Sequence, residues 1–369
     1  MSLPPQPGQW GPGVPPPGPP QPPPGYYPQS GWGAQQPPPT PPSQNNGLKW
    51  LLVTVAVLLV IAISVGIALV VTRASSGPTE TSTPPTTGAA SANDTGPVAV
   101  VTSEPTCESW MPASSSMSRI QANGWDDRDP SVPSTAWTIE QRAQHDAVAK
   151  SLRQTAEQAV TFARETPNRV IRELYEQFIA YSRAYADSVP TYTSADDPLS
   201  LASVAASLAL DAVCNSITYG SAAARSSSTS SSDPPSVVAD PGDPAAPQMF
   251  GSKSDSACSA LVQRTNEVTA DLAEWVRQDA NIPGSRWTPD QKAAEDAAAP
   301  IMTAFAADIE AIGRRGENPT LEDLAAFTAV YFRAYVSSLS SYIPADNYLI
   351  VVGLRTSNLL LTGCQATTG

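Results

Sequence analysis

The sequence predicts an all-α protein with one transmembrane helix and two tandem four-helix-bundle-like repeats. Each repeat is closed by a disulfide, and disordered proline-rich segments connect the parts. Three observations lead to this fold class: an apolar run at residues 50–71, a set of residues that recurs at a spacing of 150 positions, and four cysteines that all follow the apolar run. The 39 prolines and the serine and threonine runs leave less of the 369 residues for a core than the length suggests.

Residues 49–73 are predicted to form the transmembrane helix. Residues 50–71 contain no charged residue and no proline. As a helix they would extend roughly 33 Å, against a hydrocarbon core of about 30 Å. Because about 45 polar and proline-rich residues precede this run, we expect an uncleaved anchor rather than a signal peptide. The lipid bilayer is therefore the first predicted partner.

Cysteine placement predicts the orientation of this anchor, because the flanking charges, Lys49 on one side and Arg73 on the other, decide it poorly. No Lys, Arg, Asp or Glu precedes Lys49, and the first acidic residue is Glu80, so the net charge of -13 arises after the span. An acidic domain repels phosphate backbones, which argues against a nucleic-acid partner. An even number of cysteines on one side indicates an oxidising compartment there. We therefore expect a single-pass cell-membrane protein with a cytoplasmic N-terminus and extracytoplasmic C-terminal domains.

Three segments have the composition of disordered chain. Residues 1–48 are rich in Pro, Gly, Gln and Tyr and are expected to be an extended cytoplasmic tail, either a solvating segment or a ligand for aromatic-lined grooves of a cytoplasmic partner. Residues 74–106 are expected to be a Ser/Thr/Pro-rich stalk, and residues 216–257 a Ser/Pro-rich linker.

The internal repeat is the most specific signal in the chain. Trp137 recurs as Trp287, the segment from Tyr181 to Tyr185 recurs as Tyr331 to Tyr335, and Cys214 recurs as Cys364. Each pair is 150 positions apart, and the register is kept without a gap. The sequence therefore predicts two copies of one domain, at residues 107–215 and 258–367.

Each repeat is expected to contain four helices. Thr138 with Gln141, and Thr288 with Gln291, form capping boxes at equivalent positions. Pro112 and the serines around it predict an irregular first helix in the first repeat. The helix that follows Asn168 or Thr166 in the first repeat, and its equivalent, expected to begin at Thr320 in the second, carry their apolar residues at spacings of three and four. This spacing predicts a buried stripe.

The cysteines are predicted to close each repeat separately. Four antiparallel helices return the chain to the end where it began, which places Cys107 near Cys214 and Cys258 near Cys364. Four cysteines allow three pairings, and only this one closes both repeats identically.

The layout resembles that of the proline-rich single-pass membrane proteins of mycobacteria and related actinobacteria, which are mostly of unassigned function. The resemblance covers the whole chain: a Pro-rich tail with Tyr and Gly, one span, a Ser/Thr/Pro stalk and a small exported domain closed by cysteines. It implies a location in the cell envelope and supplies no catalytic residues.

Two groups of side chains are candidates for ligand or interhelix contacts. The first group contains arginines and aspartates that point away from the main apolar seam: Arg183, Arg333, Asp146 and Asp296. They predict either an Arg–Asp pair between neighbouring helices or a repeated site for an acidic or polar envelope ligand. The second group contains tyrosines on the apolar stripe, which predict either core packing or a lined pocket: Tyr181, Tyr185, Tyr331 and Tyr335.

Catalytic chemistry is not expected. The one histidine, His145, has no partner spacing typical of a Ser-His-Asp or Cys-His arrangement, and we interpret it as a surface residue. Glu173 and Asp323 are interpreted as caps or solvated residues. The sequence predicts no cofactor and no metal site, because the cysteines are better explained as bridges.

The sequence therefore predicts a non-enzymatic envelope protein that displays two helical modules to another envelope component or protein. One alternative is an architectural role in which the Pro-rich tail recruits cytoplasmic partners. A second is an enzyme, which would need a deep polar cleft with clustered titratable groups.

Overall fold

The structure, a computed structural model, describes residues 89–251 and 256–368. Within these ranges the regular elements are α-helices and short 3-10 helices, and no strand occurs among them. The all-α prediction is therefore confirmed for the part of the chain that the structure describes. The predicted tail at 1–48, the predicted transmembrane helix at 49–73 and the first part of the predicted stalk lie outside these residues.

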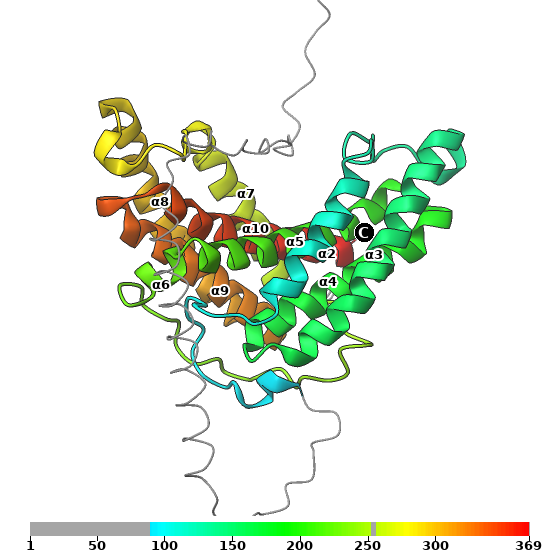
Figure 1. Ribbon diagram of the computed structural model, residues 1–369, viewed down its shortest axis with the longest axis horizontal. Helices are drawn as coiled ribbons and strands as arrows, with labels where there is room; N and C mark the ends of the chain where they lie inside the picture. The colour runs from blue at the N-terminus through cyan, green and yellow to red at the C-terminus, as the bar shows by residue number, and fades with distance from the viewer. Residues whose placement is uncertain (1–88, 252–255, 369) are drawn as a thin grey trace, which may run out of the picture. The chain divides into compact units, whose positions relative to one another are not determined.

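The first half of the described unit contains four long helices (Figure 1): α2 (Cys107–Gln121), α3 (Ile139–Glu165), α4 (Arg169–Ser188) and α5 (Asp197–Thr218). The Thr138 hydroxyl accepts the amide of Gln141, and the Gln141 side chain accepts the amide of Thr138, so the predicted capping box is present. The Asn168 side chain accepts the Ile171 amide and begins α4.

The first of these helices is regular, which corrects the prediction of an irregular one. α2 continues through Pro112. The ring of Trp110 is fully buried beside Tyr175, with ring centroids 5.3 Å apart, and its indole N–H donates to Asp211 at 2.7 Å. Burial of this large aromatic side chain outweighs the backbone hydrogen bond that Pro112 removes.

The second half also contains four long helices: α7 (Ser256–Asp271), α8 (Pro289–Gly313), α9 (Pro319–Ser338) and α10 (Asn347–Thr368). Three of them begin 150 positions after their counterparts, at 289 against 139, 319 against 169 and 347 against 197. Thr288 with Gln291 forms the second predicted capping box. Asn318, rather than the predicted Thr320, begins α9, because its side chain accepts the Leu321 amide. The same start signals therefore act in both halves.

Both disulfides pair as the sequence predicts. Cys107 is bonded to Cys214 and Cys258 to Cys364, with Cα–Cα distances of 5.4 and 5.3 Å. Each bond joins the first helix of a half to its last helix. A cross-link that closes a loop of about 100 residues removes roughly 4.7 kcal/mol of denatured-state freedom in the chain-entropy model.

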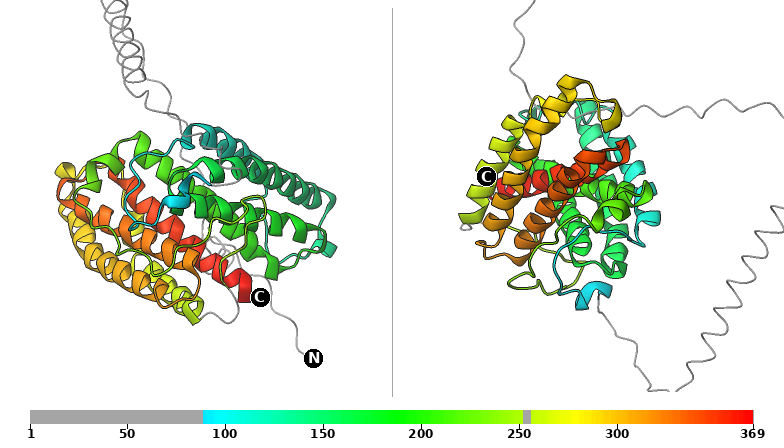
Figure 2. Two further views of the ribbon diagram at one scale, coloured as in Figure 1. Left: turned by 90° about the horizontal axis from the view of Figure 1, so that it is seen from below. Right: turned by 90° about the vertical axis from the view of Figure 1, so that its left-hand side faces the viewer.

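The two halves share one core, which corrects the expectation of separate bundles on a flexible connection. The most extensive contact between any two helices of the described residues is that of α5 with α10, and α4 also meets α9. Figures 1 and 2 show the red α10 running beside the green α5. Both helices carry apolar or small residues on most sides, so each needs a second partner outside its own half.

Residues 89–106, predicted as stalk, are packed on the helices. Val98, Val100 and Val101 are buried, and the Val101 amide donates to the Tyr331 hydroxyl at 3.2 Å. The Val98 amide donates to Ser232 of the predicted linker, and the Ser232 amide donates to the Val98 carbonyl. The stalk prediction rested on the overall composition of residues 74–106, which does not reveal a short apolar run such as Val98 to Val101.

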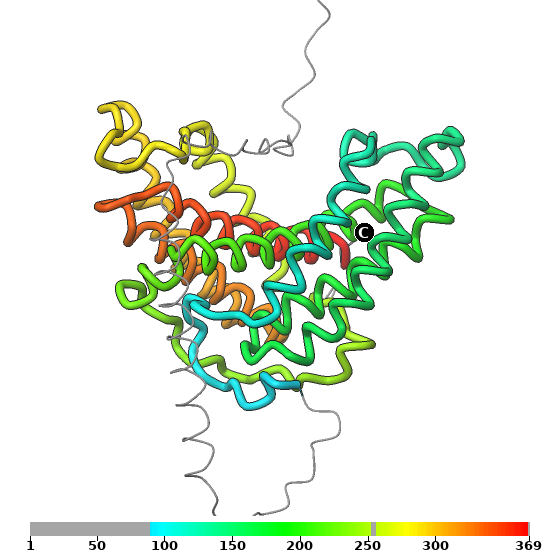
Figure 3. Tube along the Cα trace, in the orientation of Figure 1, coloured from blue at the N-terminus to red at the C-terminus, as the bar shows by residue number. Residues whose placement is uncertain are grey.

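Residues 216–251, predicted as disordered linker, are also ordered. The last turn of α5 and the short helix α6 (Ser221–Ser226) come first, and the rest of the segment follows the same side of the unit as residues 89–106 (Figure 3). Its Ser236 bonds Glu322 of α9, and Phe250 is 1% exposed beside Tyr181 of α4. The segment therefore joins the two halves rather than separating them.

Two described helices are long and apolar enough to cross a membrane: Ser194–Thr218 and Pro344–Thr367. Their apolar windows are 61% and 67% buried inside the protein, and each helix holds a disulfide cysteine. These features are typical of core helices. The predicted span at residues 50–71 lies outside the described residues.

Candidate functional site

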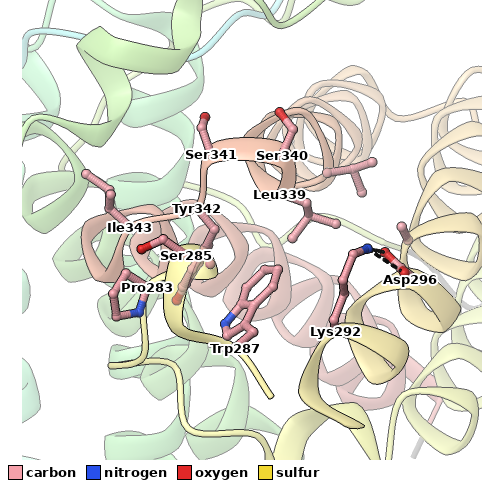
Figure 4. A pocket seen from close by; sticks show the side chains of 13 residues that line it. Pro283, Ser285, Trp287, Lys292, Asp296, Leu339, Ser340, Ser341, Tyr342 and Ile343 are labelled. Atoms are coloured by element: carbon pink, nitrogen blue, oxygen red, sulfur yellow. Dashed lines mark hydrogen bonds and ion pairs between the residues drawn. The ribbon is translucent and has the colours of Figure 1, made fainter. Parts of the chain in front are cut away.

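A groove lies on the second half, where the loop before α8 faces the end of α9 (Figure 4). Its volume is about 640 Å³. The loop contributes the 3-10 helix η6 (Gly284–Arg286), and the end of α9 continues into η7 (Leu339–Ser341). The lining residues that matter below are Gly284, Trp287, Lys292, Asp296, Leu339 and Ile343.

Backbone and aromatic contacts fix the walls of the groove. The Gly284 amide donates to the Tyr342 carbonyl at 2.9 Å and ties the two loops together. The Trp287 ring packs on the Tyr342 ring, with centroids 5.3 Å apart and an interplanar angle of 28°. The Trp287 indole donates to Ile282 at 3.0 Å, and the Tyr342 hydroxyl donates to Ala280 at 2.7 Å. Both rings are fixed before any ligand arrives, which lowers the entropic cost of binding.

The wall formed by η7 is supported from the linker. The Arg225 guanidinium of α6 donates to both carboxylate oxygens of Asp346, at 2.9 and 2.7 Å, and to the hydroxyl and carbonyl of Ser341. A bidentate pair of this kind fixes direction as well as distance. The linker therefore contributes to the shape of the groove.

A buried carboxyl group on α8 bonds two further aromatic side chains. Glu295 is 6% exposed and accepts hydrogen bonds from the Trp275 indole at 2.8 Å and the Tyr335 hydroxyl at 3.1 Å. Burial raises the pKa of Glu295 above its ordinary value, and the two hydrogen bonds oppose this shift. Glu295 thus joins α8, α9 and the loop that carries Trp275.

His145 occupies the equivalent position in the first half. It is 3% exposed, its ring stacks on Trp137 with centroids 3.8 Å apart, and its Nδ1 is 2.8 Å from the Tyr185 hydroxyl. The interpretation of His145 as a surface residue is therefore wrong, because the loop that carries Trp137 covers it. Burial, and then the charge of Arg128, lower the pKa of His145 to about 4.

The two halves differ most clearly in one groove residue. In the second half, the Lys292 ammonium bonds both oxygens of Asp296 on its own helix, at 2.8 and 2.7 Å. In the first half, the equivalent Arg142 reaches across to the loop and donates to the Ser134 carbonyl at 2.6 Å. Its guanidinium lies 5.5 Å from the centre of the Trp137 ring. The cation that contacts the loop in the first half therefore contacts its own helix in the second.

The predicted Arg–Asp pairs do not form. Arg183 donates to the Ala245 carbonyl at 2.6 Å, and Arg333 donates to Glu310 at 2.7 Å. Asp146 is exposed, whereas Asp296 bonds Lys292 and lines the groove. Long helical side chains point back toward the N-terminus of their own helix, and Glu310 on the antiparallel α8 lies at that level. In the first half the corresponding residue is Val160, so a linker carbonyl serves instead.

The four candidate tyrosines are core residues. Tyr181, Tyr185 and Tyr331 are 0% exposed and Tyr335 is 2% exposed. None is among the groove residues, although Tyr335 lies directly behind the Trp275 and Tyr342 rings. Burial raises the pKa of each of these hydroxyls.

Glu173 and Asp323 are buried, which corrects their interpretation as caps or solvated residues. They stand 150 positions apart, on α4 and α9, and meet where the halves join. Arg169 forms two hydrogen bonds to Asp323, at 2.7 and 3.0 Å, and both residues are about 1% exposed. Burial and the neighbouring Asp323 raise the pKa of Glu173 well above its ordinary value. This ionic cluster connects the halves.

Sequence reasoning missed the groove because its residues are spread over two loops and two helices. One signal was present. Among positions related by the repeat, Arg142 becomes Lys292 and Ser134 becomes Gly284, so the side chains that span the loop in one half are shortened or redirected in the other. Among the described residues, no cluster of three or more His, Cys, Asp or Glu side chains is arranged to hold a metal ion.

The fold and the site define an all-helical protein with two disulfides, two related halves around one core, and a preformed groove in the second half. Comparison with known proteins supplies the family: the chain belongs to the mycobacterial ESX-1 associated proteins, whose family profile matches residues 89–369. It is 36% identical over 373 residues to an uncharacterised protein of Mycolicibacterium smegmatis (strain MKD8), with 99% of this chain and 97% of that protein covered. No solved structure matches.

Proposed function

We propose that this chain is a non-catalytic envelope protein that works with the ESX-1 secretion system and binds a partner protein in the groove of its second half. The helical unit lies outside the membrane, and residues 49–73 anchor it. The family description supports the link to ESX-1. Two disulfides support an oxidising compartment, because cytosolic thiols are kept reduced.

The groove is the observation that carries the proposal. Its volume of about 640 Å³ falls within the range of roughly 300–1,000 Å³ typical of binding pockets. It combines a fixed aromatic surface with apolar residues, and Ile343 at its edge is 48% exposed. Such a surface suits a protruding side chain of a partner protein.

A binding role explains the buried titratable groups better than catalysis does. His145 is stacked in the core of the first half, and Glu295 is held by two neutral donors behind the groove. The charged groups that do line the groove, Lys292 and Asp296, neutralise each other. A general base near a nucleophile would need a different arrangement.

The test is carried out in a mycobacterium that secretes through ESX-1. The gene is deleted and restored as wild type, as Ser340→Trp or as Thr191→Trp, and ESX-1 substrates are measured in the culture filtrate and the cell pellet. Ser340 is an exposed groove residue, so a tryptophan there fills the groove without entering the core. Thr191 is exposed in the corresponding loop of the first half and serves as the matched control.

We expect deletion and Ser340→Trp to reduce secretion alike, and Thr191→Trp to restore it. Unchanged secretion after deletion would contradict the link to ESX-1. Full restoration by Ser340→Trp, with a defect on deletion, would contradict the groove and favour the architectural alternative. As a control, both variant proteins must be present in equal amounts in the membrane fraction, so that a secretion defect does not reflect loss of the protein.

A further inference from the structure

The first half contains a cation in the position that corresponds to the groove. The Arg142 guanidinium donates to the Ser134 carbonyl at 2.6 Å and lies 5.5 Å from the centre of the Trp137 ring. A guanidinium is planar, and it suits a carbonyl oxygen and an aromatic face at the same time. The first half therefore shows which chemical group this backbone arrangement accepts.

The second half keeps the receiving groups, but its equivalent cation, Lys292, does not contact them. Gly284 and Trp287 replace Ser134 and Trp137, and both line the groove. Among the described residues, the one hydrogen bond seen to the Gly284 carbonyl is a long one from the Trp287 amide, at 3.3 Å. Lys292 is directed to Asp296 instead. Figure 4 shows Trp287 between Tyr342 and Lys292, with the Lys292–Asp296 contact to one side.

The surrounding charges allow a cation. Two ion pairs flank the groove, Lys292 with Asp296 and Arg225 with Asp346, and each pair is neutral in itself. Asp296 is 64% exposed and can turn toward a second cation, and the chain as a whole carries a net charge of -13. An anion would have to displace Asp296 from Lys292, whereas a guanidinium would not.

We propose that the groove of the second half binds an arginine side chain of the partner protein. Its guanidinium donates to the Gly284 carbonyl and covers the Trp287 ring, as Arg142 does in the first half. Leu339 and Ile343 then contact apolar residues beside that arginine. This inference rests on the proposed binding function and names the chemistry of its ligand.

The probe is N-acetyl-argininamide, compared with the citrulline derivative, which has nearly the same shape and no charge. The full chain, labelled with ¹⁵N at tryptophan and held in detergent micelles, is titrated while the indole N–H signals are followed by NMR. We expect the Trp287 signal to move, and the citrulline derivative to bind about tenfold more weakly, because a cation over tryptophan contributes up to that factor at a partly hydrated site.

Two reciprocal variants test the mechanism. In Lys292→Arg, the new guanidinium can reach the Gly284 carbonyl and close the groove from within, so the probe is expected to lose its site. In Arg142→Lys, the first half is expected to open, so the Trp137 signal responds as well and the number of bound probes rises from one to two. Circular dichroism monitors folding in both variants.

Several outcomes would overturn the proposal. Equal affinity for the arginine and citrulline derivatives would show that charge is not recognised, and tighter binding of N-acetyl-glutamate amide would indicate an anion site at Lys292. Undiminished binding by folded Lys292→Arg would place the probe elsewhere. If the probe fails to bind while Ser340→Trp still reduces secretion, the ligand class is wrong and the groove function stands. If the probe binds while deletion leaves secretion unchanged, only the ESX-1 function is wrong.

Discussion

The two halves of the described unit share a helix register but differ in what they do with it. Equivalent helices start 150 positions apart, with the same capping residues. At one buried position, however, the first half has His145 and the second has Glu295, and at one groove position the first has Arg142 and the second has Lys292. The backbone is thus kept, while the cation at the Arg142 and Lys292 position has a loop carbonyl as its partner in one half and a carboxylate of its own helix in the other.

The ionic cluster shows the same division between the halves. α4 supplies the cations Arg169 and Arg172, and α9 supplies Glu322 and Asp323 close to the equivalent positions. The equivalent carboxyl groups Glu173 and Asp323 meet at this contact, so like charges oppose each other there. Arg169, whose equivalent in α9 is Pro319, supplies the opposite charge through which the halves join in a buried site.

The largest expected effect concerns the feature that the halves share, their disulfides. Replacing both cysteines of either bond with serine is expected to lower the free energy of unfolding by about 5 kcal/mol, because each bond closes a loop of similar length. Chemical denaturation of the full chain in micelles measures the loss. Because the core is shared, each variant is expected to unfold in one transition, and independent unfolding of one half would contradict the shared core.

The next effect tests the contact between the halves. Arg169→Met leaves Asp323 without its main cation in a site that is about 1% exposed, and the expected loss of stability is about 3–5 kcal/mol. In the double variant Arg169→Met/Asp323→Leu, most of this loss should be recovered, because the buried carboxylate of Asp323 is absent too and Asp94, the other acid beside Arg169, is 32% exposed. Denaturation midpoints of the wild type and both variants give the comparison. A double variant as unstable as the single one would show that packing, rather than charge, decides this contact.

A smaller effect is the pH dependence of stability, which should differ between the two halves. Since the pKa of His145 is lowered to about 4, the unfolded state binds its proton first as the pH falls from about 6.5. The native state should therefore lose up to about 3 kcal/mol between pH 6.5 and pH 4 through this residue, at roughly 1.4 kcal/mol per pKa unit. The difference in stability between the wild type and His145→Gln, measured across this window, isolates the effect from other buried acids.

Glu295 is expected to act in the opposite direction. Its pKa is raised in the folded state, so the native state holds the proton more tightly and loses stability as the pH rises above about 4.5. Glu295→Gln keeps an acceptor for Trp275 and Tyr335, and its stability relative to the wild type should rise with pH over this range. If His145→Gln and Glu295→Gln change the pH profile in the same direction, the two positions do not differ as described.

The smallest effect is one in which the halves should agree. Thr138→Ala and Thr288→Ala each remove the side-chain half of a capping box, and each is expected to cost about 1 kcal/mol. Thermal or chemical denaturation of the two variants provides the measurement. If the two losses of unfolding free energy differ by more than about 1 kcal/mol, the two capping boxes do not contribute equally to the stability of the shared core.

Much of the fold could be predicted because its signals are local or repeated. The capping residues, the spacing of 150 positions and the cysteine pairing all correspond to observed features. The order of residues 89–106 and 216–251 could not be predicted from composition, since short apolar pieces such as Val98 and Phe250 become informative only where a helix surface receives them. The contact between α5 and α10 could not be predicted for a similar reason. A helix that is apolar on most sides must be buried, but its sequence does not indicate which helix it packs against.

The site was less predictable than the fold. Position along a helix placed Arg183 and Asp146 at comparable angles, but it could not show that Arg183 would turn to a linker carbonyl. The burial of His145 depends on a loop that folds back over α3, which no periodicity in α3 describes. The replacement of Arg142 by Lys292 and of Ser134 by Gly284 between the repeats marks the groove more clearly than any periodicity does.

The most direct test of the open and closed halves is the exchange variant Arg142→Lys/Lys292→Arg, titrated with N-acetyl-argininamide while the tryptophan indole signals are followed. The proposal predicts that the response moves from Trp287 to Trp137 and that one probe still binds per chain. A response that stays at Trp287 in the folded exchange variant would contradict it.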